Sequence, residues 1–440
     1  MKHHPNMIGK NTFAIPVGDE WGIDSERIWL LYSPLDGKMA LANKEEAEQF
    51  IASFEAKATV PIYRMPETPH ELWQIDILAN YTCNFKCIYC YSAKGRSNKQ
   101  VDWKNIKAVI DYLFLSGKKQ TTPYIINFSG GGEPLMSFDL IKQTVEYIEQ
   151  VNEGKNYRYN IGLVTNGSLI CPDYIDYFER KKIDMAVSFE ILEHLQNKER
   201  GSYEKVAANM DMMLERGFPF GIRTTFTPES VQYMVPMIEE LNSRFPKLKK
   251  VVYDVVLAPS LFHSPDELRA YYDAFLDGFY AAKKLGAAKG IKVESIAVEL
   301  LSVVRERTCN GKLVLTPMGT ISGCARVSSP EEVHYKDYVF GEVKDGQLFF
   351  DQEKFQSILD EYNIYSFEKC HSCFARWNCG GGCRLFHHCF NEEYDEVRCD
   401  FVRKALRSEL LTVLANNFRQ ATGKNLQTHI REQIAKGALE

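Results

Sequence analysis

Short β-rich runs alternate with amphipathic helical runs over about half of this chain. The β-rich runs are LWQIDIL, TPYIINF, YNIGLV, IDMAVSF, FGIRTTF and KVVYDVVL, and helical segments such as WKNIKAVIDYLFLSG and YEKVAANMDMMLERG separate them. Strands joined by helices form parallel sheets with right-handed crossovers, and such sheets bind ligands at the carboxyl ends of their strands. The pattern therefore predicts six β/α units within residues 73–300, with a functional site where the strands end.

The two ends of the chain have different patterns. Residues 28–42, IWLLYSPLDGKMALA, alternate around Asp36-Gly37, which indicates a β-hairpin, and the helical run NKEEAEQFIASFE follows. From about residue 300 the chain changes to short strands, Gly-rich turns and dense cysteine, and then to the helical stretch DFVRKALRSELLTVLANNF. We therefore predict three domains: an N-terminal α+β extension over 1–72, the β/α domain over 73–300, and a Cys-rich domain with a C-terminal helix over 301–440.

The composition argues against several classes of partner. The chain has 440 residues and a formal net charge of −5, and no block of lysine and arginine suggests a nucleic-acid or polybasic membrane-binding surface. The N-terminus lacks the basic start and apolar run of a secretory signal, and no stretch of about 18 consecutive apolar residues occurs. We expect a cytoplasmic protein with neither membrane nor nucleic-acid partners.

The twelve cysteines are clustered rather than evenly spread. Three lie within eight residues near position 85, and eight lie between Cys309 and Cys399. Disulfide frameworks are typical of small secreted domains, whereas this chain is large and repeats the close spacings of metal-ligand motifs. The pattern favours metal binding over disulfides.

The first cysteine group follows the first strand of the β/α domain. Cys83, Cys87 and Cys90 have the spacing CxxxCxxC in a single loop, and the next cysteine is distant in sequence. Three thiolates can hold a [4Fe-4S] cluster with one iron left uncoordinated by protein, whereas the alternative, a structural zinc site, needs four ligands. After the second strand, FSGGGEPLM supplies glycines that let the backbone approach a ligand and a carboxylate suited to an ammonium group. This context favours the cluster.

These motifs resemble the radical S-adenosylmethionine (SAM) superfamily over roughly residues 75 to 300. In that family the open iron binds the amino and carboxylate groups of SAM, and electron transfer cleaves SAM to methionine and a 5′-deoxyadenosyl radical. The resemblance implies an α/β fold with a partial (β/α)6 TIM-like barrel. It also implies an external electron donor of the flavodoxin or ferredoxin type.

The resemblance assigns SAM binding to five positions, namely Tyr89, Gly132, Glu133, Ser188 and Arg200. The tyrosine is the aromatic residue before the last cysteine, and the glycine and glutamate match the GGE motif that contacts the methionine amino group. LVTNG, with Thr165, Asn166 and Gly167, lies at the next strand end. Alone, the serine could be a strand-end cap and the arginine a surface charge, but their order matches the family. Many relatives have Asp-Gly just after the serine, where this chain has Glu190-Ile191.

The C-terminal cysteines resemble those of the SPASM domain, which occurs on radical enzymes that mature peptides and proteins. Cys309 and Cys324 flank Gly319, CHSCFARWNCGGGC follows, and Cys399 comes last. The resemblance implies two auxiliary [4Fe-4S] clusters, which makes three clusters in all. The alternative is a pair of structural zinc sites.

In the SPASM pattern the ligands of the two clusters interleave. The resemblance assigns the inner cluster to Cys309, Cys324 and Cys383 and the outer cluster to Cys370, Cys373, Cys379 and Cys399. Cys389 is left over; it either completes the inner cluster or is a buried thiol, and we include it among the metal ligands. We expect Cys171 to pack as a small apolar residue.

Three functions are consistent with these resemblances. The first is a radical SAM oxidoreductase that abstracts hydrogen from a ribosomally made peptide or small protein, leading to a cross-link, a thioether or epimerisation, with residues 1–72 as a peptide-recognition or support element. The second is a formylglycine-forming enzyme like the anaerobic sulfatase maturases, which typically carry an aspartate where this chain has Ala325. The third is a non-catalytic metal scaffold, which would not explain the SAM-binding motifs. The general acid or base stays unassigned, with Tyr253 and Asp254 as strand-end candidates.

Overall fold

The computed structural model describes residues 11–54, 59–63, 66–117, 120–309 and 311–437. The chain divides into two compact units, each built from segments that are far apart in sequence. The first unit comprises residues 1–65, 297–310 and 360–440, and the second comprises residues 66–296 and 311–359. Residues 1–10, 55–58 and 64–65 of the predicted N-terminal extension lie outside the described residues.

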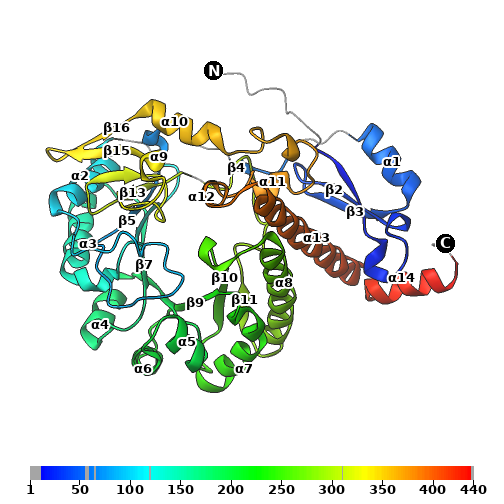
Figure 1. The fold of residues 1–440 in the computed structure, drawn as a ribbon, viewed down its shortest axis with the longest axis horizontal. Helices are drawn as coiled ribbons and strands as arrows, with labels where there is room; N and C mark the ends of the chain where they lie inside the picture. Colours follow the sequence, from blue (N-terminus) through cyan, green and yellow to red (C-terminus); the bar gives the residue numbers. More distant parts are fainter. Residues whose placement is uncertain (1–10, 55–58, 64–65, 118–119, 310, 438–440) are drawn as a thin grey trace. The chain divides into compact units, whose positions relative to one another are not determined.

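The second unit contains the predicted parallel strands (Figure 1). They are β5 (Gln74–Ile77), β6 (Tyr124–Phe128), β7 (Tyr159–Thr165), β8 (Asp184–Ser188), β9 (Gly221–Phe226) and β10 (Lys250–Val255). Neighbours in this order pair in parallel, so the prediction of six β/α units is confirmed. The carboxyl ends of all six strands therefore point the same way.

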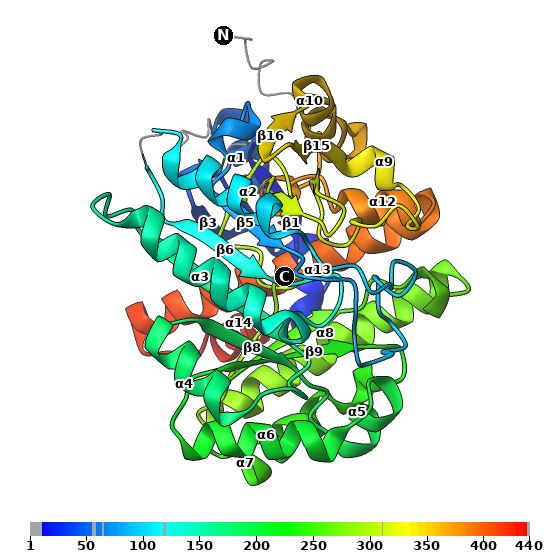
Figure 2. The ribbon, with the colours of Figure 1, turned by 90° about the vertical axis from the view of Figure 1, so that its left-hand side faces the viewer.

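Helices connect these strands and cover one face of the sheet. They are α2 (Trp103–Leu115), α3 (Phe138–Asn152), α4 (Pro172–Lys181), α5 (Glu193–Glu199), α6 (Tyr203–Glu215), α7 (Met234–Arg244) and α8 (Pro265–Ala288). Figure 2 shows α3, α4 and α6 along the outside of the strands. Burial alternates along the strands, with Ile126, Phe128 and Val187 fully buried, while the opposite faces are half-exposed. The half-exposed faces leave room for polar side chains.

Residues 311–359 extend this sheet in a way that the sequence pattern did not predict. β13 (Leu313–Leu315) pairs in parallel with β5, and β14 (Thr320–Ser322), β15 (Val339–Lys344) and β16 (Gln347–Phe350) follow as antiparallel strands. At the other edge, β11 (Lys292–Glu294) pairs in parallel with β10. The sheet has eleven strands within the described part of the chain.

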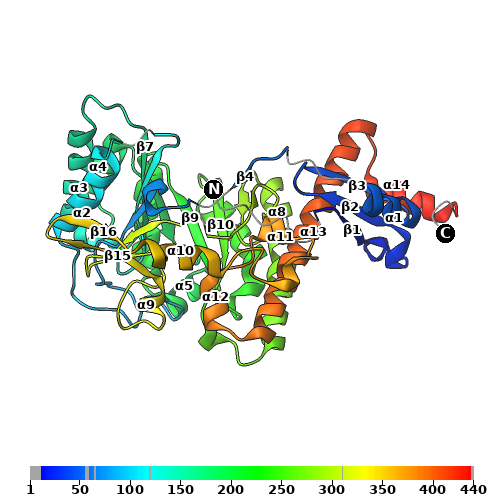
Figure 3. The ribbon, with the colours of Figure 1, turned by 90° about the horizontal axis from the view of Figure 1, so that it is seen from above.

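The first unit combines the N-terminal extension with the C-terminal cysteine region. β1 (Phe13–Pro16), β2 (Trp29–Ser33) and β3 (Lys38–Ala42) form an antiparallel sheet, and α1 (Lys44–Ser53) follows it (Figure 3). The predicted hairpin is confirmed, since Ser33 pairs with Lys38 across a turn in which Gly37 has a φ of 67°. Asn43 begins α1 with a capping box that includes Glu46.

The rest of the first unit is built from short elements and one long helix. They are β4 (Ile62–Tyr63), β12 (Val304–Arg305), α11 (Arg376–Cys379), α12 (Arg384–Cys389), α13 (Glu392–Thr422) and α14 (Leu426–Ala435). Trp377 is fully buried against Leu35, Val304 and Ile364, which joins the three segments of the unit in one core. Among the described residues, no helix is both long and apolar enough to cross a lipid bilayer.

Candidate radical-generating site and cysteine clusters

The first cysteine group lies in the loop between β5 and α2. Cys83, Cys87 and Cys90 are half-buried, and Cys90 N donates to the Cys87 carbonyl over 3.2 Å in a tight turn. Burial raises the pKa of the Cys87 and Cys90 thiols, so their thiolates need compensating positive charge, as a metal centre would provide. In the described chain none of the three forms a disulfide.

The glycine turn after β6 packs directly on the start of this loop. Gly132 N donates to the Asn80 carbonyl and Glu133 N donates to the Thr82 carbonyl, each over 2.8 Å. A Cβ atom on Gly132 would lie 1.9 Å from the Thr82 oxygen, so only glycine fits, and Gly131 has a φ of 66°. The GGE motif thus contacts Thr82, the residue directly before Cys83.

Glu133 links the GGE motif to the TNG motif at the end of β7. Its carboxylate accepts hydrogen bonds from Thr165 Oγ1 at 2.6 Å, Asn166 N at 2.7 Å and Leu135 N at 3.1 Å. The side chain is fully buried, which raises the pKa of Glu133. Asn80 supports the same turn by donating from Nδ2 to the Glu133 carbonyl and to Ser137 Oγ. Asn80 was not among the predicted site residues, although its place just after the end of β5 was the available signal.

Tyr89, Glu190 and Arg200 form a buried polar group beside the cysteine loop. The Tyr89 hydroxyl donates to Glu190 Oε1, and Arg200 Nη1 donates to the Tyr89 oxygen over 2.8 Å. Arg200 also lies 3.8 Å from the Glu190 carboxylate. The cysteine loop has a second anchor nearby, because Ile88 N donates to the Glu199 carbonyl over 3.0 Å.

Burial dominates the electrostatics of this polar group. It raises the pKa of Glu190 to about 8, although Arg200 and Tyr89 favour the charged form. The next residue, Ile191, is fully buried with a φ of 62°, which is an uncommon conformation for a β-branched side chain. Ile191 therefore adopts the left-handed conformation that a glycine would adopt without strain.

The remaining strand-end residues separate into two faces. Ser188 is half-buried and pairs with Arg223, whose guanidinium makes a 2.7 Å ion pair with Asp254. Tyr253 lies on the opposite, fully buried face, and its hydroxyl donates to the Met234 carbonyl over 2.9 Å. Of the two acid–base candidates, only Asp254 is therefore on the open face of the sheet.

The outer cysteine set is brought together within the first unit. Cys370 ends a 3₁₀ turn, Cys373 follows it, Cys379 ends α11, and Cys399 lies in the second turn of α13. Burial, followed by the neighbouring thiols of the set, raises the pKa of Cys370 to about 12. Burial likewise raises the pKa of Cys399 to about 12. Cys370 lies near enough to each of the other three thiols for their charges to affect its pKa, and four cysteines are the number of ligands that a closed cluster needs.

The cysteines assigned to the inner cluster are divided between the units. Cys309, Cys383 and Cys389 belong to the first unit, and Cys324 belongs to the second. Cys389, at the end of α12, is exposed and is therefore not the buried thiol of the alternative prediction. Cys171 is half-buried at the start of α4.

Comparison with known proteins identifies the second unit. Residues 77–241 match the family model of the radical SAM superfamily, and this range includes the cysteine loop, the GGE turn and the buried polar group. Residues 77–241 therefore form a radical SAM domain, the domain of an enzyme. Radical SAM enzymes use a [4Fe-4S] cluster and SAM, and the three half-buried thiols beside a glycine turn fit both. This match argues against the alternative of a non-catalytic metal scaffold.

Relatives of this radical SAM enzyme include proteins of known and unknown activity. An uncharacterized protein of Methanocaldococcus jannaschii is 32% identical over 164 residues, which cover 36% of this chain and 54% of that protein. Radical SAM cyclopropyl synthase TigE of Paramaledivibacter caminithermalis is 21% identical over 342 residues, which cover 72% of this chain and 69% of TigE. The chain thus spans about half to two thirds of the length of these relatives.

Two solved structures have the same fold as this enzyme. anSMEcpe with bound AdoMet aligns with a TM-score of 0.60 and 17% identity, covering 77% of this chain and 98% of anSMEcpe. Streptococcus suis SuiB bound to its precursor peptide SuiA aligns with a TM-score of 0.53 and 13% identity, covering 88% of this chain and 97% of SuiB. At these identities the likeness concerns the fold, and the prediction of an α/β barrel with flanking elements is confirmed.

Proposed function

We propose that this radical SAM enzyme modifies a ribosomally made peptide by abstracting hydrogen from a side-chain or α carbon. The observation that carries the proposal is the convergence of Cys370, Cys373, Cys379 and Cys399 in a unit that also contains the N-terminal sheet. A second cysteine group in the same chain as a radical SAM domain is typical of maturases with SPASM domains, and SuiB, which shares the fold, is described with a bound precursor peptide.

The residues of the cysteine loop have distinct roles in this proposal. A [4Fe-4S] cluster held by Cys83, Cys87 and Cys90 supplies, with SAM bound, the reductive cleavage that gives a 5′-deoxyadenosyl radical. Gly132 gives the backbone close access to the methionine part of SAM, and Glu133 retains acceptor capacity for its amino group, because a carboxylate can accept about four hydrogen bonds.

Arg200 and Ser188 are the remaining proposed SAM contacts. The support for Ser188 is its half-buried place at the carboxyl end of β8, on the face that also presents Arg223. Arg200 and Tyr89 are engaged with each other and with Glu190, so we infer that they also fix the shape of the cysteine loop. A fixed loop would keep the three cysteine sulfurs in a constant arrangement for the cluster that they would hold.

The auxiliary centres have unequal support. For the outer cluster, the proximity of its four cysteines supports the assignment. For the inner cluster, Cys309, Cys324 and Cys383, with Cys389 as the fourth candidate, the assignment rests on the SPASM pattern alone. An external flavodoxin or ferredoxin remains the proposed source of the electron.

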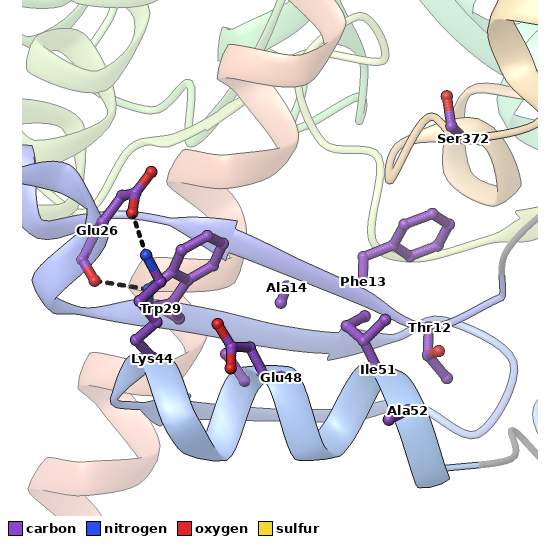
Figure 4. Close-up of a pocket in the computed structure, with 11 residues that line it drawn as sticks. Thr12, Phe13, Ala14, Glu26, Trp29, Lys44, Glu48, Ile51, Ala52 and Ser372 are labelled. Atoms are coloured by element: carbon purple, nitrogen blue, oxygen red, sulfur yellow. Dashed lines mark hydrogen bonds and ion pairs between the residues drawn. The ribbon is translucent and has the colours of Figure 1, made fainter.

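We propose that the N-terminal extension binds part of the peptide. A groove of about 480 Å³ lies between β1 and α1, with Ala14, Trp29, Ala47 and Ile51 among its apolar lining (Figure 4). At one end, Lys44 Nζ contacts Glu26 Oε2 over 2.8 Å, which adds paired charges to the apolar surface. β1 is an edge strand of the described sheet, and an edge strand can pair with an extended peptide.

A matched pair of variants tests this groove. Ile51→Glu places a charge on its lining, and Gln49→Glu places the same charge on an exposed position of α1 outside it. We expect Ile51→Glu to weaken binding of the substrate peptide at least tenfold while Gln49→Glu does not. Equal affinities of both variants and the unmodified enzyme would contradict a role for the groove.

The alternative function, formylglycine formation in a sulfatase, is less well supported. The residue after Cys324 is Ala325. A Cβ atom on Gly130 would lie 3.4 Å from the carbonyl oxygen of Ala325. The position where the sulfatase maturases typically carry a carboxylate base therefore lies beside the glycine turn but holds a methyl group. Another base, such as Asp254, would have to replace it.

One experiment distinguishes these functions. The enzyme is purified without oxygen and incubated with SAM, a reductant and the short peptides encoded next to its gene, or with a sulfatase-derived peptide containing cysteine or serine. We expect 5′-deoxyadenosine and a mass change in a neighbouring peptide. Formylglycine in the sulfatase peptide would favour the alternative, and turnover only with a small metabolite would overturn both.

A further inference from the structure

Arg96 contacts one of the three cysteines of the radical-generating site. It lies in the same loop, six residues after Cys90, and Arg96 Nη2 donates to Cys90 Sγ over 3.1 Å. Arg96 is half-buried, and its Nη1 is buried without a hydrogen-bond partner among the described residues. A charged donor of this kind has a strong preference for a thiolate over a neutral thiol.

The other two cysteines have weaker donors. Cys83 Sγ accepts a long hydrogen bond, 3.5 Å, from the backbone N–H of Phe85. Cys87 receives favourable charge from Arg200 only through space, and no side-chain donor to its sulfur is present in the described chain. Cys90 differs because it receives the backbone N–H of Ser92 in addition to the guanidinium. The sulfurs of this site are therefore hydrogen-bonded unequally.

The position of Arg96 is set by the packing of the residue before it. A Cβ atom on Gly95 would lie 2.6 Å from Ser329 Cβ, so a larger residue would push the loop away. The turn that it packs against is itself fixed, because Glu332 accepts hydrogen bonds from Ser328 N and Ser329 N. The close packing of Gly95 against Ser329 therefore fixes the part of the loop from which Arg96 reaches Cys90 Sγ.

We propose that Arg96 raises the reduction potential of the cluster bound by Cys83, Cys87 and Cys90. A one-electron donor of the flavodoxin or ferredoxin class adds one negative charge to the cluster, from [4Fe-4S]2+ to [4Fe-4S]1+, and a fixed cation with an N–H···S bond stabilises the more negative state. Arg96 is a positioning residue in this account, since it acts through the cysteine and not on SAM. The inference rests on the cluster assignment in the proposed function.

The test is a redox titration of the whole enzyme followed by electron paramagnetic resonance. The cluster of interest is recognised as the signal that changes when SAM is added, which separates it from auxiliary clusters. We expect Arg96→Gln to shift the midpoint potential of this signal to a more negative value, and Arg96→Lys to shift it less. Lys94→Gln, which removes an exposed cation two residues away, should leave the midpoint unchanged.

The outcomes separate this inference from the assignment beneath it. Unchanged midpoints in both Arg96 variants, with iron content retained, would overturn the role of Arg96 alone. If Arg96→Gln does not retain the cluster, the midpoint potential of Arg96→Lys is the test. An unchanged midpoint in Arg96→Lys would overturn the role of Arg96, and a more negative midpoint would support it. A wild-type enzyme with no SAM-responsive signal would overturn the cluster assignment itself.

Discussion

Thr165 donates a 2.6 Å hydrogen bond from Oγ1 to the buried carboxylate of Glu133, which joins the ends of β6 and β7 beside the cysteine loop. The same carboxylate accepts from the backbone N–H of Asn166. Two motifs separated by about thirty residues are thus one structural element. The link depends on both oxygens of the Glu133 carboxylate, because Oε1 accepts from Thr165 and Oε2 accepts from Asn166.

Replacing Glu133 by glutamine should destabilise the apoprotein by about 2 kcal/mol, because the amide nitrogen cannot accept from Thr165 or Asn166 and leaves a buried donor unsatisfied. The measurement is the free energy of unfolding from urea titration of the whole chain. Glu146→Gln, at an exposed position of α3, is the matched control and should change it little. Equal stabilities of the two variants would show that the carboxylate bonds contribute nothing.

Gly132→Ala should prevent normal assembly of the cysteine loop. The added methyl group would overlap the Thr82 carbonyl oxygen, and the backbone would have to move at a cost of about 3 kcal/mol or more. Gly221→Ala in β9 meets no atom within 4 Å and should cost less than about 0.5 kcal/mol. Iron content after anaerobic reconstitution and unfolding free energy are the readouts, and wild-type values for Gly132→Ala would contradict the packing argument.

Glu190 should make the folded apoprotein less stable as the pH rises. Since burial raises its pKa from 4.5 to about 8, the folded state holds a proton between these values that the unfolded state has lost. Its contribution therefore declines across that window, by at most about 1.4 kcal/mol per pH unit, and levels off above it. Glu190→Gln should flatten this part of the stability profile relative to wild type, whereas the exposed control Glu193→Gln should not. Parallel profiles for Glu190→Gln and wild type between pH 5 and pH 8 would show that Glu190 is ionised in the folded state.

Tyr253→Phe should leave the chemistry intact. The hydroxyl is buried and bonded to the Met234 carbonyl, away from the open face of the sheet. We expect a loss of about 1 kcal/mol of unfolding free energy and an unchanged rate of SAM cleavage. A large fall in that rate with stability retained would return Tyr253 to the list of acid–base candidates.

Local sequence patterns predicted the helices, strands and turns. They did not predict which side chains from distant segments are in contact. Asp36-Gly37 predicted the hairpin because a tight β-turn needs a residue with positive φ. The motifs that follow the strands lie close together because the carboxyl ends of parallel strands lie at the same edge of the sheet. The spacing from Ser188 to Arg200 gave no sign that the arginine is buried against Tyr89 and Glu190, since those partners lie in other segments.

The grouping of distant segments was likewise beyond a local pattern. β13 pairs with β5 although about 235 residues separate them, and the N-terminal sheet shares a core with Trp377. Such pairings depend on side-chain packing across the whole chain and not on periodicity within a window. Arg96 was missed for the same reason, because its importance lies in a contact with Cys90 that only the folded loop creates.

Cys83, Cys87 and Cys90 form the proposed radical-generating centre. The most direct measurement is 5′-deoxyadenosine formation by anaerobically reconstituted enzyme with SAM and dithionite, compared between wild type, the triple variant Cys83→Ala/Cys87→Ala/Cys90→Ala and the control Cys171→Ala. We predict that wild type and Cys171→Ala form 5′-deoxyadenosine and that the triple variant, which keeps the later cysteines, forms none. Formation of 5′-deoxyadenosine by the triple variant at the wild-type rate would show that these three cysteines do not hold the radical-generating cluster.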